Sequence, residues 1–310
     1  MTEKKETSIH PTLVVLAAGM GSRYGGLKQV DPMGPYGETI IDYSVFDAMR
    51  AGFGKVVFVI RKSIEKDFLE TFANRFLKNV PYEIVFQELD LLPGGEHCPD
   101  SRTKPWGTVH AIWVCREIVK EPFVVINADD FYGREAFETL ASFLKNNKEE
   151  NPQSYAMCVY NLGNTLSEHG SVTRGICKVT PKGYLESVDE QTNIEIKASG
   201  EIISYTTEHA MNLAPELKVS MNMWAFNPSF FPLAEKYFLE FLKARGTEQT
   251  AEFVTPQLVD ILIRKGEGRV RVLQSPAQWF GITYAEDKPM VIQKLKKLAK
   301  KKEYPEKLWK

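Results

Sequence analysis

The stretch Leu13-Val-Val-Leu-Ala-Ala-Gly-Met-Gly-Ser-Arg-Tyr-Gly-Gly-Leu-Lys28 passes directly from an apolar run into glycines and two cations. The apolar run predicts a buried central strand, and the glycines predict a turn at its end. Backbone N–H groups at Gly19 and Gly21 can approach an anion closely, because glycine has no Cβ. Arg23 and Lys28 add positive charge. The stretch therefore predicts a phosphate-binding loop, suited to holding a triphosphate while a P–O bond is exchanged.

Two better-known glycine motifs do not fit this loop. A P-loop needs Gly-Lys-Ser/Thr five residues after its first glycine, and Leu27 follows Gly26 where the lysine should stand. The dinucleotide fingerprint Gly-x-Gly-x-x-Gly fails as well, since Tyr24 occupies the third glycine position after Gly19 and Gly21. An ordinary glycine-rich turn between a strand and a helix is the alternative for this stretch taken alone.

Composition sets the broad class of protein. The 310 residues are 43% hydrophobic, which is enough for a sizeable core, and the formal charge of −1 does not favour nucleic acid or an anionic membrane as a partner. No run of eighteen apolar residues predicts a membrane span, and the polar N-terminus lacks a signal-peptide core. We expect a cytoplasmic protein. The cysteines contain no Cys-x-x-Cys and suit a reducing compartment; they are Cys98, Cys115, Cys158 and Cys177.

Strand and helix patterns alternate in the first half of the chain. This predicts an α/β fold, Rossmann-like and doubly wound, with a mixed, mainly parallel sheet. The expected strands are 13–18, 55–60, 82–87 and 123–127, and the expected helices are 42–51, capped by Asp42, 63–79 and one starting at 107. Residues 91–106 form a loop or lid. The second half is β-rich, with expected strands 155–160, 176–180, 184–189, 195–205, 270–273 and 279–284, and helices 231–244, 252–264 and one capped by Asp287.

Chemistry is expected where these strands end. Ligands of such sheets gather beyond the carboxyl ends of the strands, where the glycine loop, Gln87 and Asp129 emerge. Asp129 is a predicted metal ligand, and Mg²⁺ is the ion that fits by hardness and availability. We interpret the neighbouring Asp130 as a cap of the following helix. Cations, a carboxylate and small polar groups indicate nucleotidyl transfer, in which a phosphate attacks the α-phosphorus of an NTP and pyrophosphate leaves.

Several motifs, in one order from residue 13 to about 265, resemble those of the sugar-1-phosphate nucleotidylyltransferases, the NDP-sugar pyrophosphorylases. The resemblance implies a glycosyltransferase-A-like nucleotidyltransferase fold. The matching residues are Leu16-Ala-Ala-Gly-Met-Gly-Ser-Arg23 followed by Lys28, Gln87, Gly107-Thr-Val-His-Ala111, Val125-Ile-Asn-Ala-Asp129, Gly175, Glu190, Asn222 and Glu252-Phe253.

The resemblance also implies roles for these residues. Arg23 would hold the departing pyrophosphate, Lys28 would lie near the α-phosphate, and Asp129 would bind the metal, which makes these three the catalytic set. The implied nucleotide contacts are Leu16, Ala17, Ala18, Gly19, Gly21, Gln87, Gly107 and Thr108, and the implied sugar contacts are Gly175, Glu190 and Asn222. We expect one domain, 1–310, with a nucleotide-binding half (11–150), an acceptor-binding half (151–290) and a C-terminal helix and tail (287–310).

The chain departs from the family pattern in three places. Leu27 stands where the family has proline before its lysine. The second metal aspartate of the family lies in a Trp-x-Asp-x-Gly segment, and Trp279-Phe-Gly-Ile-Thr-Tyr284 contains none. Asp287 is one substitute, with helix capping as its alternative role, and Asn222 is another. The third departure is the 91–106 insertion, which has no clear family counterpart.

The leading hypothesis is Mg²⁺-dependent synthesis of an NDP-sugar and pyrophosphate from a sugar 1-phosphate and UTP, dTTP or CTP. A second hypothesis keeps the fold and transfers a cytidylyl group to a non-sugar phosphate, such as phosphocholine or a polyol phosphate; the short spacing to Lys28 favours it. A third is a catalytically inactive sugar-nucleotide sensor or regulatory subunit. The sequence leaves the base, the sugar and the oligomeric state open, a homo-oligomer included.

Overall fold

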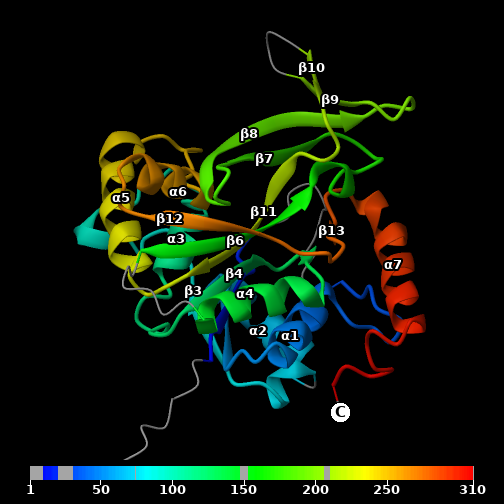
Figure 1. The fold of residues 1–310 in the computed structure, drawn as a ribbon. Helices are drawn as coiled ribbons and strands as arrows, with labels where there is room; N and C mark the ends of the chain where they lie inside the picture. The colour runs from blue at the N-terminus through cyan, green and yellow to red at the C-terminus, as the bar shows by residue number, and fades with distance from the viewer. Residues whose placement is uncertain (1–9, 20–30, 74, 147–152, 206–209, 310) are drawn as a thin grey trace, which may run out of the picture.

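A computed structural model describes residues 10–19, 31–73, 75–146, 153–205 and 210–309. Within them, an eleven-stranded mixed sheet runs in the order β10-β9-β8-β7-β11-β4-β1-β2-β3, with β6 on β11 and β12 on β6 (Figure 1). The strands of this sheet are β1 (Thr12–Leu16), β2 (Lys55–Ile60), β3 (Tyr82–Phe86), β4 (Phe123–Asn127), β6 (Ser154–Asn161), β7 (Val172–Val179), β8 (Leu185–Ile196), β9 (Ile202–Tyr205), β10 (Ala210–Leu213), β11 (Lys218–Phe226) and β12 (Arg269–Gln274). A separate small sheet pairs β5 (Asp130–Phe131) with β13 (Phe280–Gly281).

The parallel core of the sheet is β3-β2-β1-β4, with β1 paired in parallel to both β2 and β4. Strand β11 then pairs antiparallel with β4, β6 and β7, and β7 to β10 continue antiparallel. The mixed α/β fold expected from the sequence is confirmed, with a larger antiparallel share in the second half than the expected "mainly parallel" sheet.

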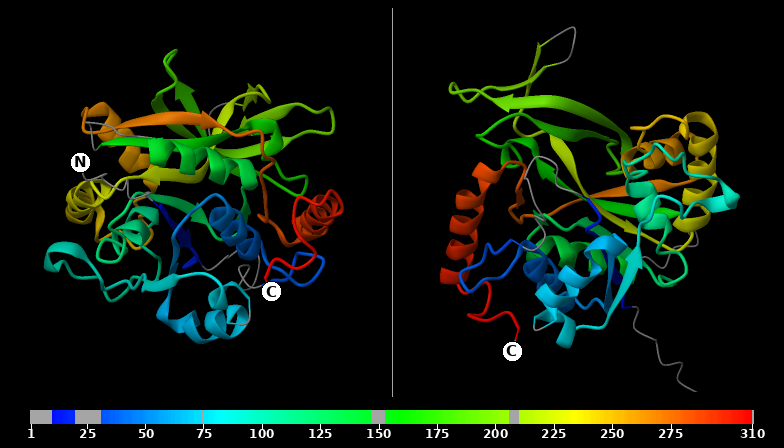
Figure 2. Two further views of the ribbon diagram at one scale, coloured as in Figure 1. Left: turned by 60° about the horizontal axis from the view of Figure 1, so that its bottom comes forward. Right: turned by 180° about the vertical axis from the view of Figure 1, so that it is seen from behind.

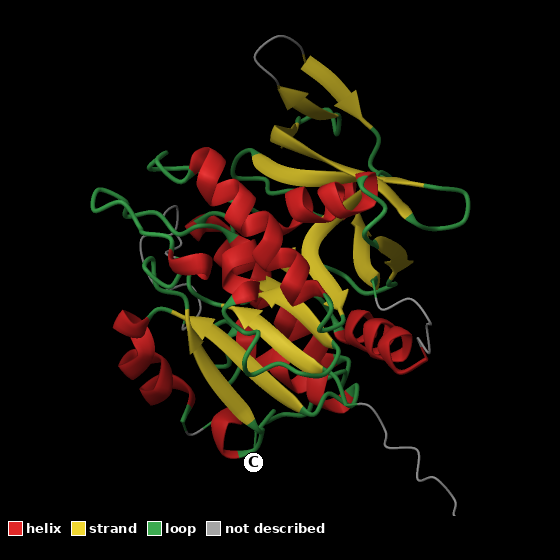
Figure 3. Ribbon diagram, turned by 90° about the vertical axis from the view of Figure 1, so that its left-hand side faces the viewer, coloured by secondary structure: helices red, strands yellow, loops and turns green. Residues whose placement is uncertain are grey.

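Helices cover both faces of the parallel core (Figures 2 and 3). Side chains of β1 alternate between the faces. Leu13 and Val15 pack with α1 (Ile40–Arg50), α2 (Glu65–Phe72) and α4 (Arg134–Asn146), while Val14 packs with α3 (Thr108–Trp113), α5 (Phe230–Arg245) and α6 (Thr255–Arg264). Burial on both faces explains why the strand is a continuous apolar run. Helix α7 spans Lys288–Lys300.

Several predicted element bounds were wrong. Helix α1 begins at Ile40, because Thr39 is the N-cap and Asp42 completes a capping box by accepting the Thr39 N–H at 2.8 Å. The predicted helix 63–79 contains only α2, flanked by 3₁₀ turns at 62–64 and 76–78. The predicted strand 279–284 shortens to β13.

Strand β11 was not among the strands predicted from the sequence. Its apolar pattern is interrupted at Asn222, which adopts the left-handed φ of 59°, and its pairing with β6 shifts register between Ser220 and Trp224. A bulge of this kind breaks the period-2 alternation by which a strand is recognised. The bulge lies where β11 pairs with β6 and β7.

The C-terminal segment packs back against the first helix (Figure 1). The Tyr304 hydroxyl donates to Asp47 at 2.8 Å, and the Trp309 indole N–H donates to Asp42 at 2.8 Å. Val291 of helix α7 packs in one apolar cluster with Tyr43 of α1 and Tyr304. Among the helices described here, none combines the length and apolar character that crossing a bilayer requires.

Candidate active site

Two adjoining cavities lie at the carboxyl edge of the parallel strands. The smaller cavity, about 220 Å³, is lined by predicted nucleotide contacts such as Gln87 and Gly107, and we call it the nucleotide-side cavity. The larger, about 500 Å³, is lined by the predicted sugar contacts Gly175, Glu190 and Asn222, and we call it the acceptor-side cavity. The residues that line both are Thr108, Asn127, Asp129 and Val254. Asp129, which follows β4, therefore stands where the two cavities meet.

The nucleotide-side cavity gathers most of the predicted nucleotide contacts. Its lining includes Leu16, Ala18, Gly19, Gln87, Gly107 and Thr108. Ala17 differs: it is fully buried, does not line the cavity, and donates its N–H to the Val59 carbonyl at 2.8 Å. Gly21, Arg23 and Lys28 lie outside the described residues, so their roles stay predictions.

The Gln87 side chain is fixed in one orientation. Its amide nitrogen donates to the Gly107 carbonyl at 3.1 Å and lies 3.4 Å from His110 Nδ1. His110 Nε2 lies 2.8 Å from the Leu91 carbonyl; because a carbonyl only accepts, Nε2 carries the proton and Nδ1 accepts. Burial lowers the pKa of His110 to about 4, so the ring is neutral. Gln87 thus keeps its carbonyl oxygen as the group available to a ligand in this cavity.

Gly107 and Thr108 join α3 to the start of α6. Gly107 has a φ of 102°, and a Cβ there would lie 2.4 Å from the Phe253 carbonyl oxygen. The Thr108 hydroxyl lies 2.8 Å from that of Thr255 and accepts the Thr255 N–H at 2.7 Å. The Thr108 hydroxyl is therefore used within the protein. These contacts fix the wall at which the two cavities adjoin.

The 91–106 insertion is tied to the nucleotide side. Arg102 is 4% exposed, lies 3.5 Å over the Trp106 ring, and donates to the carbonyls of Glu248 at 2.7 Å and Ala251 at 2.5 Å. The carbonyl of Leu91 holds His110, as described above. The insertion thus braces the residues that orient Gln87.

The acceptor-side cavity brings together the three predicted sugar contacts, Gly175, Glu190 and Asn222. Gly175 on β7 is the direct cross-strand partner of Glu190 on β8. A Cβ at Gly175 would lie 2.7 Å from Val188 Cγ1, so glycine is the residue that fits there. Glu190 is exposed and presents its carboxylate at the cavity.

Asn222 also lines this cavity, but both ends of its amide have protein partners. Its Oδ1 accepts the Trp224 indole N–H at 2.9 Å, and its Nδ2 donates to Asn127 Oδ1 at 2.7 Å. Asn127 in turn donates through Nδ2 to Asp130 Oδ2 at 2.9 Å. The amide chain therefore runs from β11 to the residue after Asp129, and a sugar contact by Asn222 stays a prediction.

Asp130 was interpreted from the sequence as a helix cap, and this was wrong. Its Oδ2 accepts from Asn127 and from the Tyr132 hydroxyl at 3.2 Å, the side chain is 9% exposed, and it lines the acceptor-side cavity. Burial, followed by the neighbouring Asp129 carboxylate, raises the pKa of Asp130 above its ordinary range. The consecutive aspartates after a buried strand were the signal in the sequence.

Arg174 is a second lining residue that the sequence analysis missed. It is 9% exposed, donates from Nε to the Thr165 carbonyl at 3.1 Å, and lies 5.2 Å over the Trp279 ring. Burial lowers its pKa to about 10, so it remains cationic at neutral pH. Nothing in the local sequence separates this arginine from a surface one.

Asp287, a proposed substitute metal ligand, lines neither of the two cavities. Its Oδ1 accepts from the Ser167 hydroxyl at 2.7 Å, and its Oδ2 accepts the N–H groups of Thr283 and Tyr284 at 2.9 and 2.8 Å. Both oxygens thus hold the turn before α7. The structure favours the capping alternative for Asp287.

The described residues fit a magnesium site that has few protein ligands. They contain no group of three His, Cys, Asp or Glu side chains that could enclose a metal. Mg²⁺, however, is commonly bound by one or two carboxylates, with substrate phosphates and water as its other ligands. Asp129 and Asp130 at the cavity wall are hard oxygen donors of this type.

Solved structures share this fold over almost their full length. The inositol-1-phosphate CTP transferase from T. maritima is 13% identical, with a TM-score of 0.61 over 93% of this chain and 97% of that one. A UDP-glucose pyrophosphorylase complexed with UDP-glucose is 16% identical, with a TM-score of 0.59 over 93% and 99%. A putative glucose-1-phosphate thymidylyltransferase from Bacillus anthracis is 12% identical, with a TM-score of 0.60 over 96% and 98%. The expected nucleotidyltransferase fold is confirmed.

Sequence comparison identifies the family. No curated protein matches the chain. The model of the family described as "Nucleotidyl transferase" matches residues 12–190, which include the glycine loop, Gln87, Asp129 and Glu190. The chain therefore belongs to the nucleotidyl transferase family.

Proposed function

We propose that this nucleotidyltransferase transfers a nucleotidyl group from an NTP to a sugar 1-phosphate, giving an NDP-sugar and pyrophosphate. The observation that carries the proposal is the position of Asp129, which lines both cavities. On one side of it lie the residues that the family resemblance links to the nucleotide, and on the other side lie Gly175 and Glu190. A donor and an acceptor held in these cavities would meet at Asp129.

In the proposed reaction, an oxygen of the acceptor phosphate attacks the α-phosphorus of the NTP. A new P–O bond forms, the bond to the β-phosphate breaks, and its electron pair leaves with pyrophosphate. Arg23 and Lys28 neutralise the departing charge, and Asp129 holds Mg²⁺, which when bound supplies further charge neutralisation. No covalent intermediate with the protein is needed.

Recognition of the two substrates is divided between the cavities. The Gln87 carbonyl oxygen accepts a hydrogen bond from an N–H of the base, such as N3–H of uracil or thymine or N4–H of cytosine. Glu190 accepts hydrogen bonds from sugar hydroxyls, and Gly175 leaves room for the ring to approach the backbone. Glu190 is what favours a sugar over other phosphorylated acceptors.

A second candidate keeps the donor side and changes the acceptor to a non-sugar phosphate, with CTP as donor. The likeness to an inositol-1-phosphate CTP transferase supports it, since its TM-score of 0.61 is close to the 0.59 and 0.60 of the two sugar-nucleotide enzymes. The spacing of Lys28 favours it too. A catalytically inactive sensor is the third candidate, against which Asp129 at the junction of the cavities argues.

The test is pyrophosphate release with Mg²⁺, a panel of NTPs, and sugar 1-phosphates beside inositol 1-phosphate and phosphocholine. Turnover with a sugar 1-phosphate supports the proposal; turnover with the other acceptors alone selects the second candidate; no turnover leaves the sensor. Glu190→Gln should raise KM for the sugar phosphate and leave KM for the NTP unchanged. Glu186→Gln is the matched control, since Glu186 lies on the same strand, pairs with Lys178 and lines neither cavity.

A further inference from the structure

The segment 279–284, in which the family pattern has its second metal aspartate, lies directly against Asp130. In the small sheet, Gly281 of β13 is the cross-strand partner of Asp130 on β5. A Cβ on Gly281 would lie 2.4 Å from Asp130 Oδ1, closer than any real contact allows. The carboxylate of Asp130 therefore occupies the space into which a side chain at position 281 would project.

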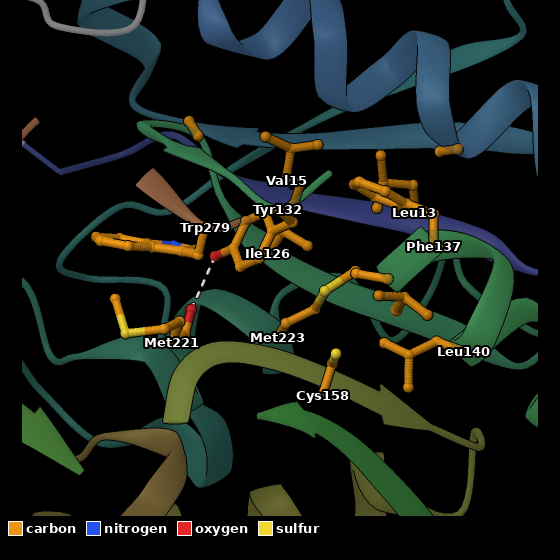
Figure 4. Close-up of a cluster of buried hydrophobic side chains, with 14 of the residues drawn as sticks. Leu13, Val15, Ile126, Tyr132, Phe137, Leu140, Cys158, Met221, Met223 and Trp279 are labelled. Atoms are coloured by element: carbon orange, nitrogen blue, oxygen red, sulfur yellow. Dashed lines mark hydrogen bonds between the residues drawn. The ribbon is translucent and has the colours of Figure 1, made fainter. Parts of the chain in front are cut away.

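The Asp130 carboxylate is held in this position through its other oxygen. Oδ2 accepts from Asn127 Nδ2 at 2.9 Å and lies 3.2 Å from the Tyr132 hydroxyl. The single proton of that hydroxyl is shared with the Met221 carbonyl at 2.9 Å, the dashed line in Figure 4, and Asn127 is held by Asn222 at 2.7 Å. Such outer contacts orient a ligating carboxylate in metal sites.

Oδ1 lies on the Gly281 side of this carboxylate. The side chain is 9% exposed and lines the acceptor-side cavity, so the carboxylate forms part of the cavity wall. Arg174, the buried cation of the same wall, forms no ion pair with Asp130; it donates instead to Thr165 and Thr173. A carboxylate at a cavity wall that no direct ion pair with a described residue neutralises is a hard oxygen donor suited to a divalent cation.

We propose that Asp129 and Asp130 together bind a divalent cation, with Asp130 Oδ1 taking the place of an aspartate at position 281. The second carboxylate has thus moved across the β5–β13 ladder instead of being lost. The cation would complete its coordination with water and substrate phosphate, as Mg²⁺ does at sites with few protein ligands. The inference rests on the proposed function in that the ion would serve nucleotidyl transfer.

The test measures metal binding directly, by titrating the protein with Mn²⁺ alone and following the EPR signal of free Mn²⁺. Asp129→Asn and Asp130→Asn should each weaken binding by about tenfold or more, because each removes a charged ligand. Asp189→Asn is the matched control: it removes one exposed carboxylate on β8 that lines neither cavity, and binding should be unchanged. Circular dichroism confirms that each variant is folded.

Gly281→Ala supplies a second, independent variant. Its methyl group would displace Asp130 Oδ1, so Mn²⁺ binding should weaken although no carboxylate is removed. The proposal is overturned if Asp130→Asn or folded Gly281→Ala binds Mn²⁺ like the unaltered protein, or if the unaltered protein binds none at millimolar concentration. The assay contains no nucleotide, so a protein that binds Mn²⁺ through this pair but releases no pyrophosphate refutes the proposed function and retains this site.

Discussion

Replacing Asn222 separates two contributions that this residue makes, its backbone conformation and its amide. With a φ of 59°, alanine at this position costs about 1 to 2 kcal/mol, whereas glycine adopts the conformation freely. Both replacements remove the amide. The fully buried Trp224 then loses the acceptor of its indole N–H, at about 1 to 3 kcal/mol. Asn127 Oδ1 loses a donor but lines a cavity that water can enter, at about 0.5 to 1 kcal/mol.

The expected loss in free energy of unfolding is therefore about 1.5 to 4 kcal/mol for Asn222→Gly, and about 1 to 2 kcal/mol more for Asn222→Ala. Urea denaturation followed by tryptophan fluorescence measures both. Asn193 is the matched control: its φ is 52°, it is exposed, and its side chain makes no hydrogen bond with the described residues. Asn193→Ala should cost only the backbone contribution, and Asn193→Gly close to nothing.

Mn²⁺ affinity gives a readout that a purely structural role would not move. Both Asn222 variants should weaken Mn²⁺ binding equally, because both release Asn127 and through it the Asp130 carboxylate. Neither Asn193 variant should change it. The reasoning is refuted if both Asn222 variants stay within about 0.5 kcal/mol of the unaltered protein, or if they lose stability while Mn²⁺ affinity is unchanged.

Arg23→Ala should lower kcat by a few hundredfold, which corresponds to a loss of about 3 to 4 kcal/mol of transition-state stabilisation, and the melting temperature should not change. A lower melting temperature at full activity would assign the arginine a structural role. Gly107→Ala should destabilise the protein by about 3 kcal/mol or more in urea denaturation, because the new Cβ meets the Phe253 backbone. Gly266 also has a positive φ but has open space around it, so Gly266→Ala should cost about 1 to 2 kcal/mol. Equal losses would contradict the packing described here. Burial lowers the pKa of His110 from 6.5 to about 4, so between these pH values the folded state binds fewer protons than the unfolded state. The free energy of unfolding therefore falls as the pH drops from about 6.5 to about 4. His110→Phe should remove this part of the pH dependence of unfolding, and an unchanged slope would show that the ring titrates normally.

The parallel core could be predicted from the sequence because its signals are local. Each of the strands 55–60, 82–86 and 123–127 is a short, strongly apolar run followed by polar residues. Alternation with helices fixes their parallel direction, and parallel strands place their carboxyl ends at one edge. For this reason the sequence predicts that the glycine turn, Gln87 and Asp129 lie close together. In the structure, Gly19, Gln87 and Asp129 line one cavity.

The orientation of side chains in the site was not available from the sequence. The direction of the Gln87 amide depends on His110 and on the Leu91 carbonyl of the insertion, which are contacts between separate elements. Arg174 lines the acceptor-side cavity on a strand, β7, that pairs with β11, whose bulge has no periodic signature. Burial of a charged side chain follows from such packing.

Sequence alone thus determined the family, the order of the core elements, and Asp129 as the residue at the end of the fourth parallel strand. Only the tertiary structure decided which residues surround Gly281, the position at which the family pattern has an aspartate. The physical reason is that Asp130 and Gly281 are brought opposite each other by strand pairing between distant parts of the chain. This pairing depends on the register between two strands, and a one-dimensional pattern contains no register between segments that far apart.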